Sequence, residues 1–492
     1  MTRYQLASAD TDLAHARRTS HAPTPHPSVL AALLLAPAAV RGQFGSTENR
    51  YELGLRLRAF DRDWDEQTDA ARKRSVEPLK RANFFFLTKQ DGEAARNLDR
   101  ARLLLGSADP NPAIVWAASC MLRPDARLLD ASRNRLAVTL DHFYEPKLDM
   151  PKNLTLQLSL GSSGGGGSLT SRSLVRTPLK VSMGILKAAD DEDCTLEGAI
   201  LQDKKRLARF TQTISMVKNL EERLKKIEKG VASLPKDKNT TDVLTVRSLA
   251  SLLRQLADRK TLETDYPAAR LLHEVEEGLQ AVAAGKSYHG RNRAGQFWLT
   301  LPVKDGGAPV RVQVPAAAKK GQPLPLVVAV HGAGGSENMF FDAYGDGIIT
   351  RLCSERGWPL VATRNGLADG VLDEIAHLYP VDPKAIFLVG HSMGAAQVVA
   401  AAGRNPERFA GVAALGGGGR VVPSEALKGV SFFVGAGTED FLLGGACVLN
   451  DNLKKAEVKR VRYKEYKDTE HLVVVQRALP EVFAFFDEVL KR

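Results

Sequence analysis

Cysteine is scarce in this chain, with four residues in 492. No two of them form a Cys-x-x-Cys pair, so structural zinc sites and thioredoxin-like redox motifs have no support. No other cluster of metal-ligating residue types stands out, and we expect neither a metal nor another cofactor. Four thiols allow three full disulfide pairings, and the sequence does not choose among Cys120, Cys194, Cys353 and Cys447.

Long apolar runs and a strong charge imbalance are also missing. No stretch reaches the roughly 18 consecutive apolar residues of a membrane-spanning helix, so we expect no transmembrane segment. The net charge of +11 is small for 492 residues, and no pattern of basic and aromatic residues organises it. We therefore expect no nucleic-acid partner. A hydrophobic content of 44% is typical of a globular protein, and the length allows two or more domains.

A short apolar run at residues 29–40 has the length of the central region of a signal peptide. Arginines precede it and small residues follow it. We predict that residues 1–42 are a leader, that the mature chain begins near Gln43, and that the protein is exported to the periplasm or secreted. A short buried helix is the alternative interpretation.

The most informative stretch is Ile386–Ala396. Apolar residues run into a Gly-x-Ser-x-Gly turn, and a helix-forming run follows. This strand–turn–helix context is typical of a nucleophile elbow. It predicts Ser392 as the nucleophile, with the backbone N–H of Met393 directed at a developing oxyanion. The alternative is an incidental serine in a glycine-rich turn, because the chain contains 41 glycines.

A serine nucleophile requires a base, and the base requires a group that orients it. Hydrolases with this elbow have the chain order serine, acid, histidine. His471 is the only histidine after Ser392, which makes it the predicted base. Asp440, in a loop after an apolar strand, is the predicted acid. Glu439 and Asp468 remain alternatives, because either carboxylate could hold an imidazole.

A second oxyanion donor is expected in the loop after the apolar run at residues 326–330. That loop begins with a His-Gly pair of the kind used by esterases. Its glycines allow backbone N–H groups to turn inward, and Ala333 or Gly334 is the predicted donor. His331 and His391 are predicted to pack and to form hydrogen bonds rather than to act in catalysis.

Together, these motifs resemble those of the α/β-hydrolases. Residues 288–492, about two-fifths of the chain, are most similar to serine esterases of the polyhydroxybutyrate-depolymerase and feruloyl-esterase type. The resemblance implies a mostly parallel sheet with helices on both faces, and hydrolysis of a small-molecule or polymeric ester through an acyl-enzyme. It is carried by Leu326–Gly335, Tyr379–Pro383, Ile386–Gly394, Gly437–Asp440 and His471.

Two other functions remain open. A peptidase similar to the prolyl oligopeptidases would use the same triad, but the N-terminal part lacks the regular strand repeats of a propeller. A cell-envelope interaction protein would use the N-terminal part and carry an inactive hydrolase domain. The intact order Ser392, Asp440, His471 argues against such inactivation.

The N-terminal part is predicted to contain three regions. Apolar residues at helical spacing indicate helices in residues 43–131, and alternating leucines indicate a small antiparallel β unit in residues 132–200. A near-heptad stripe beginning at Leu207 predicts a helical hairpin region in residues 201–286. We expect these regions to contact a polymeric substrate or the cell envelope.

The polar, basic stretch at residues 285–295 is predicted to be a linker with few contacts. On that basis residues 288–492 should fold alone and hydrolyse small esters.

Overall fold

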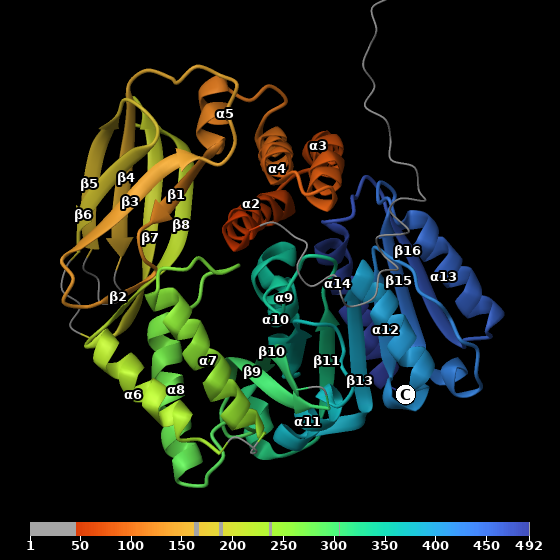
Figure 1. Ribbon diagram of the computed structural model, residues 1–492. Coiled ribbons are helices and arrows are strands. Elements are labelled where there is room, and N and C mark those ends of the chain that lie inside the picture. The colour runs from red at the N-terminus through yellow and green to blue at the C-terminus, as the bar shows by residue number, and fades with distance from the viewer. Residues whose placement is uncertain (1–45, 162–166, 186–189, 236–238, 305, 492) are drawn as a thin grey trace, which may run out of the picture. The chain divides into compact units, whose positions relative to one another are not determined.

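The computed structural model describes residues 46–161, 167–185, 190–235, 239–304 and 306–491 (Figure 1). The predicted leader, the expected start near Gln43 and most of the Gly/Ser loop at residues 161–168 lie outside these ranges. Everything described here belongs to one compact unit, residues 44–492. Within the described ranges, no helix combines the length and the apolar content needed to cross a membrane.

An eight-stranded sheet forms the centre of the C-terminal part, in the order β16-β15-β14-β13-β11-β12-β10-β9. β10 pairs antiparallel with β9 and β12, and the other neighbours pair parallel. The predicted α/β-hydrolase fold is confirmed. The strands are β9 (Gly295–Val303), β10 (Gly306–Val314), β11 (Leu324–Val330), β12 (Leu360–Thr363), β13 (Val381–His391), β14 (Gly411–Leu415), β15 (Ser431–Gly437) and β16 (Arg460–Tyr466).

Helices cover both faces of this sheet because alternate side chains of each strand point to opposite sides. Leu326 and Val328 lie in a core formed with α11, α12 and α13, whereas Val327 and Ala329 lie in a core formed with α9, α10 and α14. These helices are α9 (Met339–Asp342), α10 (Tyr344–Arg356), α11 (Val371–Leu378), α12 (Met393–Arg404), α13 (Leu443–Lys455) and α14 (Val474–Leu490).

Helices also open the described chain, as the sequence predicts. Ser46 and Thr68 cap the first two, each accepting a hydrogen bond from a backbone N–H of the first turn. Phe60 of the first helix and Leu98 of the third share a core with Val473 at the start of α14. The N-terminal helices therefore pack directly on the hydrolase part. They are α2 (Thr47–Asp65), α3 (Asp69–Leu87), α4 (Asp91–Gly106) and α5 (Pro112–Ala118).

The β unit that follows is larger than predicted. It contains a three-stranded sheet, β1-β3-β6, and a five-stranded sheet, β2-β8-β7-β4-β5, around one shared core. The alternating leucines lie in β3 and β4, as expected. The strands are β1 (Cys120–Pro124), β2 (Leu128–Asp130), β3 (Arg135–His142), β4 (Leu154–Gly161), β5 (Gly167–Leu174), β6 (Leu179–Gly184), β7 (Glu192–Gln202) and β8 (Lys205–Val217).

Two predicted boundaries are wrong. β1 and β2 lie inside the region predicted to be helical, and β8 occupies the first part of the predicted hairpin region. Leu207, Phe210, Ile214 and Val217 have helical spacing, but the run also contains the β-branched Thr211. β8 pairs antiparallel with β7 from Lys205 to Met216, and this long-range pairing overrides the local periodicity.

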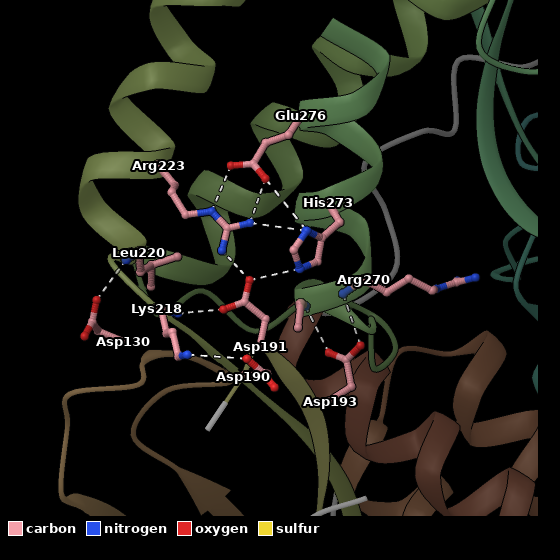
Figure 2. A network of polar contacts seen from close by, with 11 residues as sticks. Asp130, Asp190, Asp191, Asp193, Lys218, Leu220, Arg223, Arg270, His273 and Glu276 are labelled. Carbon is pink, nitrogen blue, oxygen red and sulfur yellow. Dashed lines mark hydrogen bonds and ion pairs between the residues drawn. The ribbon is translucent and has the colours of Figure 1, made fainter. Parts of the chain in front are cut away.

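Three helices follow β8, namely α6 (Leu220–Ala232), α7 (Thr241–Ala257) and α8 (Ala268–Ala283). A polar network joins α6 and α8 to the β unit (Figure 2). Arg223 of α6 donates to Glu276 of α8 at 2.8 Å and forms an ion pair with Asp191. Asp193 of β7 accepts from the N–H of Ala269 at 3.0 Å, at the first turn of α8. The network fixes these helices against the strands.

The predicted linker at residues 285–295 is wrong. The backbone N–H groups of Tyr288 and His289 donate to Asp242 of α7 at 2.9 and 3.0 Å, and both side chains are buried. Trp298 of β9 belongs to the core of α6, α7 and α8. Tyr288 and His289 therefore attach this stretch to α7, although most of the residues around them are exposed. The expectation that residues 288–492 fold alone therefore loses its basis.

Candidate active site

Ser392 occupies a strained turn between β13 and α12. Its φ of 54° and ψ of −117° lie outside the regions that L-residues prefer. The flanking glycines are required by space, because a Cβ on Gly390 would lie 2.3 Å from the carbonyl oxygen of Gly394. A Cβ on Gly394 would lie 2.1 Å from the carbonyl oxygen of Val330. The Ser392 N–H donates to Leu415 of β14 at 2.9 Å, so the neighbouring strand holds the strained turn.

His471 and Asp440 are buried together at the carboxyl end of the sheet. His471 Nδ1 lies 2.9 Å from Asp440 Oδ1. Burial lowers the pKa of His471, but the Asp440 carboxylate and then Glu470 outweigh this, and the net pKa is raised. Asp440 Oδ1 also accepts from the N–H of Leu442 at 2.8 Å, which fixes the carboxylate. This geometry suits an acid that orients an imidazole.

The alternative acids have other partners. Glu439 forms an ion pair with Lys80 of α3, and its N–H donates to Thr469. Asp468 lies 4.0 Å from Lys73, at partly exposed positions. Among the carboxylates predicted for this role, the structure brings Asp440 to the histidine.

The histidine that precedes Ser392 joins the turn to the His471 loop. His391 Nε2 lies 3.1 Å from the carbonyl oxygen of His471, and the two rings are 4.6 Å apart. In the described part of the chain, Ser392 Oγ makes no hydrogen bond to His471. Catalytic hydrogen bonds are often long before substrate binds. His391 is thus a hydrogen-bonding residue, as predicted.

The loop after β11 lies against Ser392. A Cβ on Gly332 would lie 3.0 Å from Ser392 Cβ. Ala333 and Gly334 are half-buried in this loop, and Met393 is the first residue of α12, whose N-terminus has no side-chain cap. The roles of these three N–H groups in an oxyanion hole remain predictions. His331 Nδ1 lies 2.6 Å from the carbonyl oxygen of Gly332, and its Nε2 lies 2.8 Å from that of Arg364.

Sequence reasoning missed the residues behind His391. Tyr344 Oη lies 2.7 Å from His391 Nδ1, and the Tyr344 N–H donates to Asp61 of α2 at 3.1 Å. Burial, followed by the nearby His471, holds the pKa of His391 well below its usual range, so the ring is neutral. Asp61 and Tyr344 are 283 residues apart, and no local pattern marks either of them.

Residues 361–464 match a family model described as "Putative esterase". This segment of the C-terminal part is similar to esterases. The match contains Ser392 and Asp440 and ends before His471. Carboxylic ester hydrolysis is the activity that this family match supports for the chain. No curated protein matches the sequence.

Solved structures of esterases resemble parts of the chain. An S-formylglutathione hydrolase from Staphylococcus aureus is 14% identical, with a TM-score of 0.33, over 41% of this chain and 98% of its own. A ferulic acid esterase is 17% identical, with a TM-score of 0.35, over 41% of this chain and 99% of its own. A thermostable esterase is 15% identical, with a TM-score of 0.36, over 75% of this chain and 99% of its own.

The four cysteines are all free thiols. Cys120, Cys194 and Cys353 are buried, and burial raises the pKa of the first two to about 12. Such thiols are protonated at neutral pH and do not act as nucleophiles. They take no part in the candidate site.

Proposed function

We propose that this esterase cleaves carboxylic esters through an acyl-enzyme formed on Ser392, with His471 as the base and Asp440 as its orienting acid. One observation carries the proposal. The serine sits at the strained turn between β13 and α12, and the hydrogen-bonded His471–Asp440 pair is attached to that turn through His391. Strain of this kind persists where the surroundings hold it, and it clusters at active sites.

The reaction proceeds in two halves. Ser392 Oγ attacks the carbonyl carbon while His471 Nε2 takes its proton, and Asp440 keeps the imidazole in the right tautomer. The N–H of Met393 and an N–H of Ala333 or Gly334 stabilise the oxyanion. The alcohol leaves with the proton from His471. Water then attacks the acyl-enzyme with the same base, which releases the acid and regenerates the serine.

An aromatic ring next to His471 indicates that the substrate carries an apolar group. The centroid of the Phe441 ring lies 4.4 Å from that of His471, and Phe441 is 42% exposed. An exposed aromatic ring next to the reacting groups favours an aromatic or aliphatic acyl chain. The proposed substrates include both small-molecule and polymeric esters.

A fluorophosphonate probe and a panel of esters test the proposal. The probe should form one covalent adduct, and peptide mapping should place it on Ser392. The full-length protein should also hydrolyse p-nitrophenyl or feruloyl esters. An adduct on another residue, or an unlabelled protein that still turns over esters, would overturn the mechanism.

We also propose that the protein is exported. The ground for this proposal is the apolar run within residues 1–42, together with the residues that flank it. N-terminal sequencing of protein recovered outside the cytoplasm should then begin near Gln43. A cytoplasmic product that retains Met1 would contradict export.

A further inference from the structure

Two N-terminal helices contact three of the loops that surround the candidate site, at residues 331–335, 437–440 and 467–473. Arg50 of α2 donates to the carbonyl oxygen of Gly334 at 3.0 Å. Lys80 of α3 forms an ion pair with Glu439. Asn83 of α3 donates from Nδ2 to Glu470 Oε1 at 2.6 Å.

The contact at Glu470 is the one that reaches the base. Glu470 immediately precedes His471 and is 1% exposed. Its two carboxyl oxygens have separate partners, because Oε1 accepts from Asn83 and Oε2 accepts from the N–H of Leu472 at 2.7 Å. The same side chain is therefore bonded to α3 and to the residue that follows the base.

We propose that Asn83, acting through Glu470, is a positioning residue for His471, so that helix α3 sets both the orientation and the protonation of the base. This inference rests on the proposed function for its catalytic meaning.

The charges around the base follow from the same contacts. Burial raises the pKa of Glu470 to about 7, and the hydrogen bond from Asn83 opposes this rise. The charge of Glu470 in turn raises the pKa of His471. Loss of the Asn83 donor should therefore leave Glu470 protonated to higher pH and lower the pKa of His471. The titratable groups that face this pair are Asp440 from the β15 loop and His391 from the end of β13, with the Lys80–Glu439 ion pair next to Asp440.

A purely structural role predicts something different. If Asn83 only attaches α3 to the hydrolase part, its loss would weaken folding without an effect on His471 that depends on Glu470. Asn97 of α4 supplies the matched control. It is 8% exposed, against 6% for Asn83, and its Nδ2 donates to Glu93 of its own helix at 2.9 Å.

The test is an NMR titration of His471 in the full-length chain, assigned by loss of its signal in His471→Gln. The variants are Asn83→Leu, Glu470→Gln, the double variant and Asn97→Leu. Asn83→Leu and Glu470→Gln should each lower the pKa of His471 by about half a pH unit or more. In the Glu470→Gln background, Asn83→Leu should have no further effect, and Asn97→Leu should have none in either background.

The kinetics should agree with the titration. Asn83→Leu should lower kcat about 10-fold with little change in KM, because a displaced base affects the reacting geometry rather than binding.

Two results would overturn the inference. One is a His471 pKa that is the same in Asn83→Leu and Asn97→Leu. The other is a shift of the His471 pKa by Asn83→Leu that is equally large in the wild-type and Glu470→Gln backgrounds. If Asn83→Leu does not fold, the Glu470→Gln variant tests the inference by itself. An unchanged His471 pKa in that variant would show that the charge of Glu470 does not act on His471, and this would overturn the inference. Failure of the wild type to hydrolyse esters would refute the proposed function, and the titration would still decide whether α3 acts on His471.

Discussion

The two halves of the candidate site are held in different ways. The nucleophile half, Ser392 with its flanking glycines, is set by one strand, one turn and one helix that are continuous in sequence. The base half, His471 with Asp440, lies in loops whose partners come from α3 and from other strands. The turn that carries the serine is therefore continuous in sequence, held by one hydrogen bond to β14, whereas the surroundings of His471 come almost entirely from distant segments.

Removal of the nucleophile should have the largest effect. Ser392→Ala should lower kcat about 10⁶-fold, since the covalent step loses its attacking group. Circular dichroism and the thermal unfolding midpoint should change little, because alanine takes the same backbone conformation as serine. Measurable ester turnover near the wild-type rate would show that the nucleophile half lies elsewhere.

Removal of the acid tests the base half. Asp440→Asn should lower kcat by about 10⁴-fold, because the amide favours the wrong imidazole tautomer. Glu439→Gln is the matched control, since Glu439 pairs with Lys80, whereas its neighbour Asp440 pairs with His471. The control should stay within a few-fold of wild type. If the two variants exchange these effects, Glu439 is the acid.

A small addition beside the serine tests how tightly the nucleophile half is packed. Gly332→Ala would place a Cβ 3.0 Å from Ser392 Cβ and 3.1 Å from His391 Nδ1. We expect kcat to fall by roughly 10- to 100-fold, since sub-ångström displacement of the reacting groups is costly. Gly444→Ala, where no atom lies within 4 Å of the added Cβ, should leave kcat unchanged. Equal kinetics for the two variants would show that the loop after β11 adapts.

The buried carboxyl of the base half should appear in the pH dependence of stability. The pKa of Glu470 is raised by burial from 4.5 to about 7 in the folded protein. A raised pKa means that the folded state binds the proton more tightly, so stability is full below pH 4.5 and is lost as pH rises through 7.

Glu470→Gln removes this titration. The free energy of unfolding of the wild type, relative to that of the variant, should fall by roughly 3 kcal/mol between pH 4.5 and 8. Urea denaturation at several pH values measures the difference. The amide of the variant can shift the free energy of unfolding by a constant amount at every pH. If the difference between wild type and variant does not change with pH over that range, Glu470 titrates with its ordinary pKa.

Much of the hydrolase part follows from the sequence because its elements are locally encoded. The apolar runs that form β11, β13 and β15 are buried on both faces, and such strands are continuous in sequence. The order of Ser392, Asp440 and His471 could be proposed because chain order is a property of the sequence. The N-terminal part was predicted less well, since the spacing in β8 fits a helix until its pairing with β7 is known.

The sequence by itself determined the elbow and the residue types available for the chemistry, because both depend on neighbours within a few positions, and the resemblance of these motifs to those of the α/β-hydrolases indicated the fold. Only the tertiary structure decided which carboxylate meets His471, that Tyr344 supports His391, and that Asn83 reaches Glu470 across 387 residues. The physical reason is that burial and hydrogen bonding act through space. A carboxyl group acquires a raised pKa, and an asparagine acquires a partner, only when distant segments exclude water from them together.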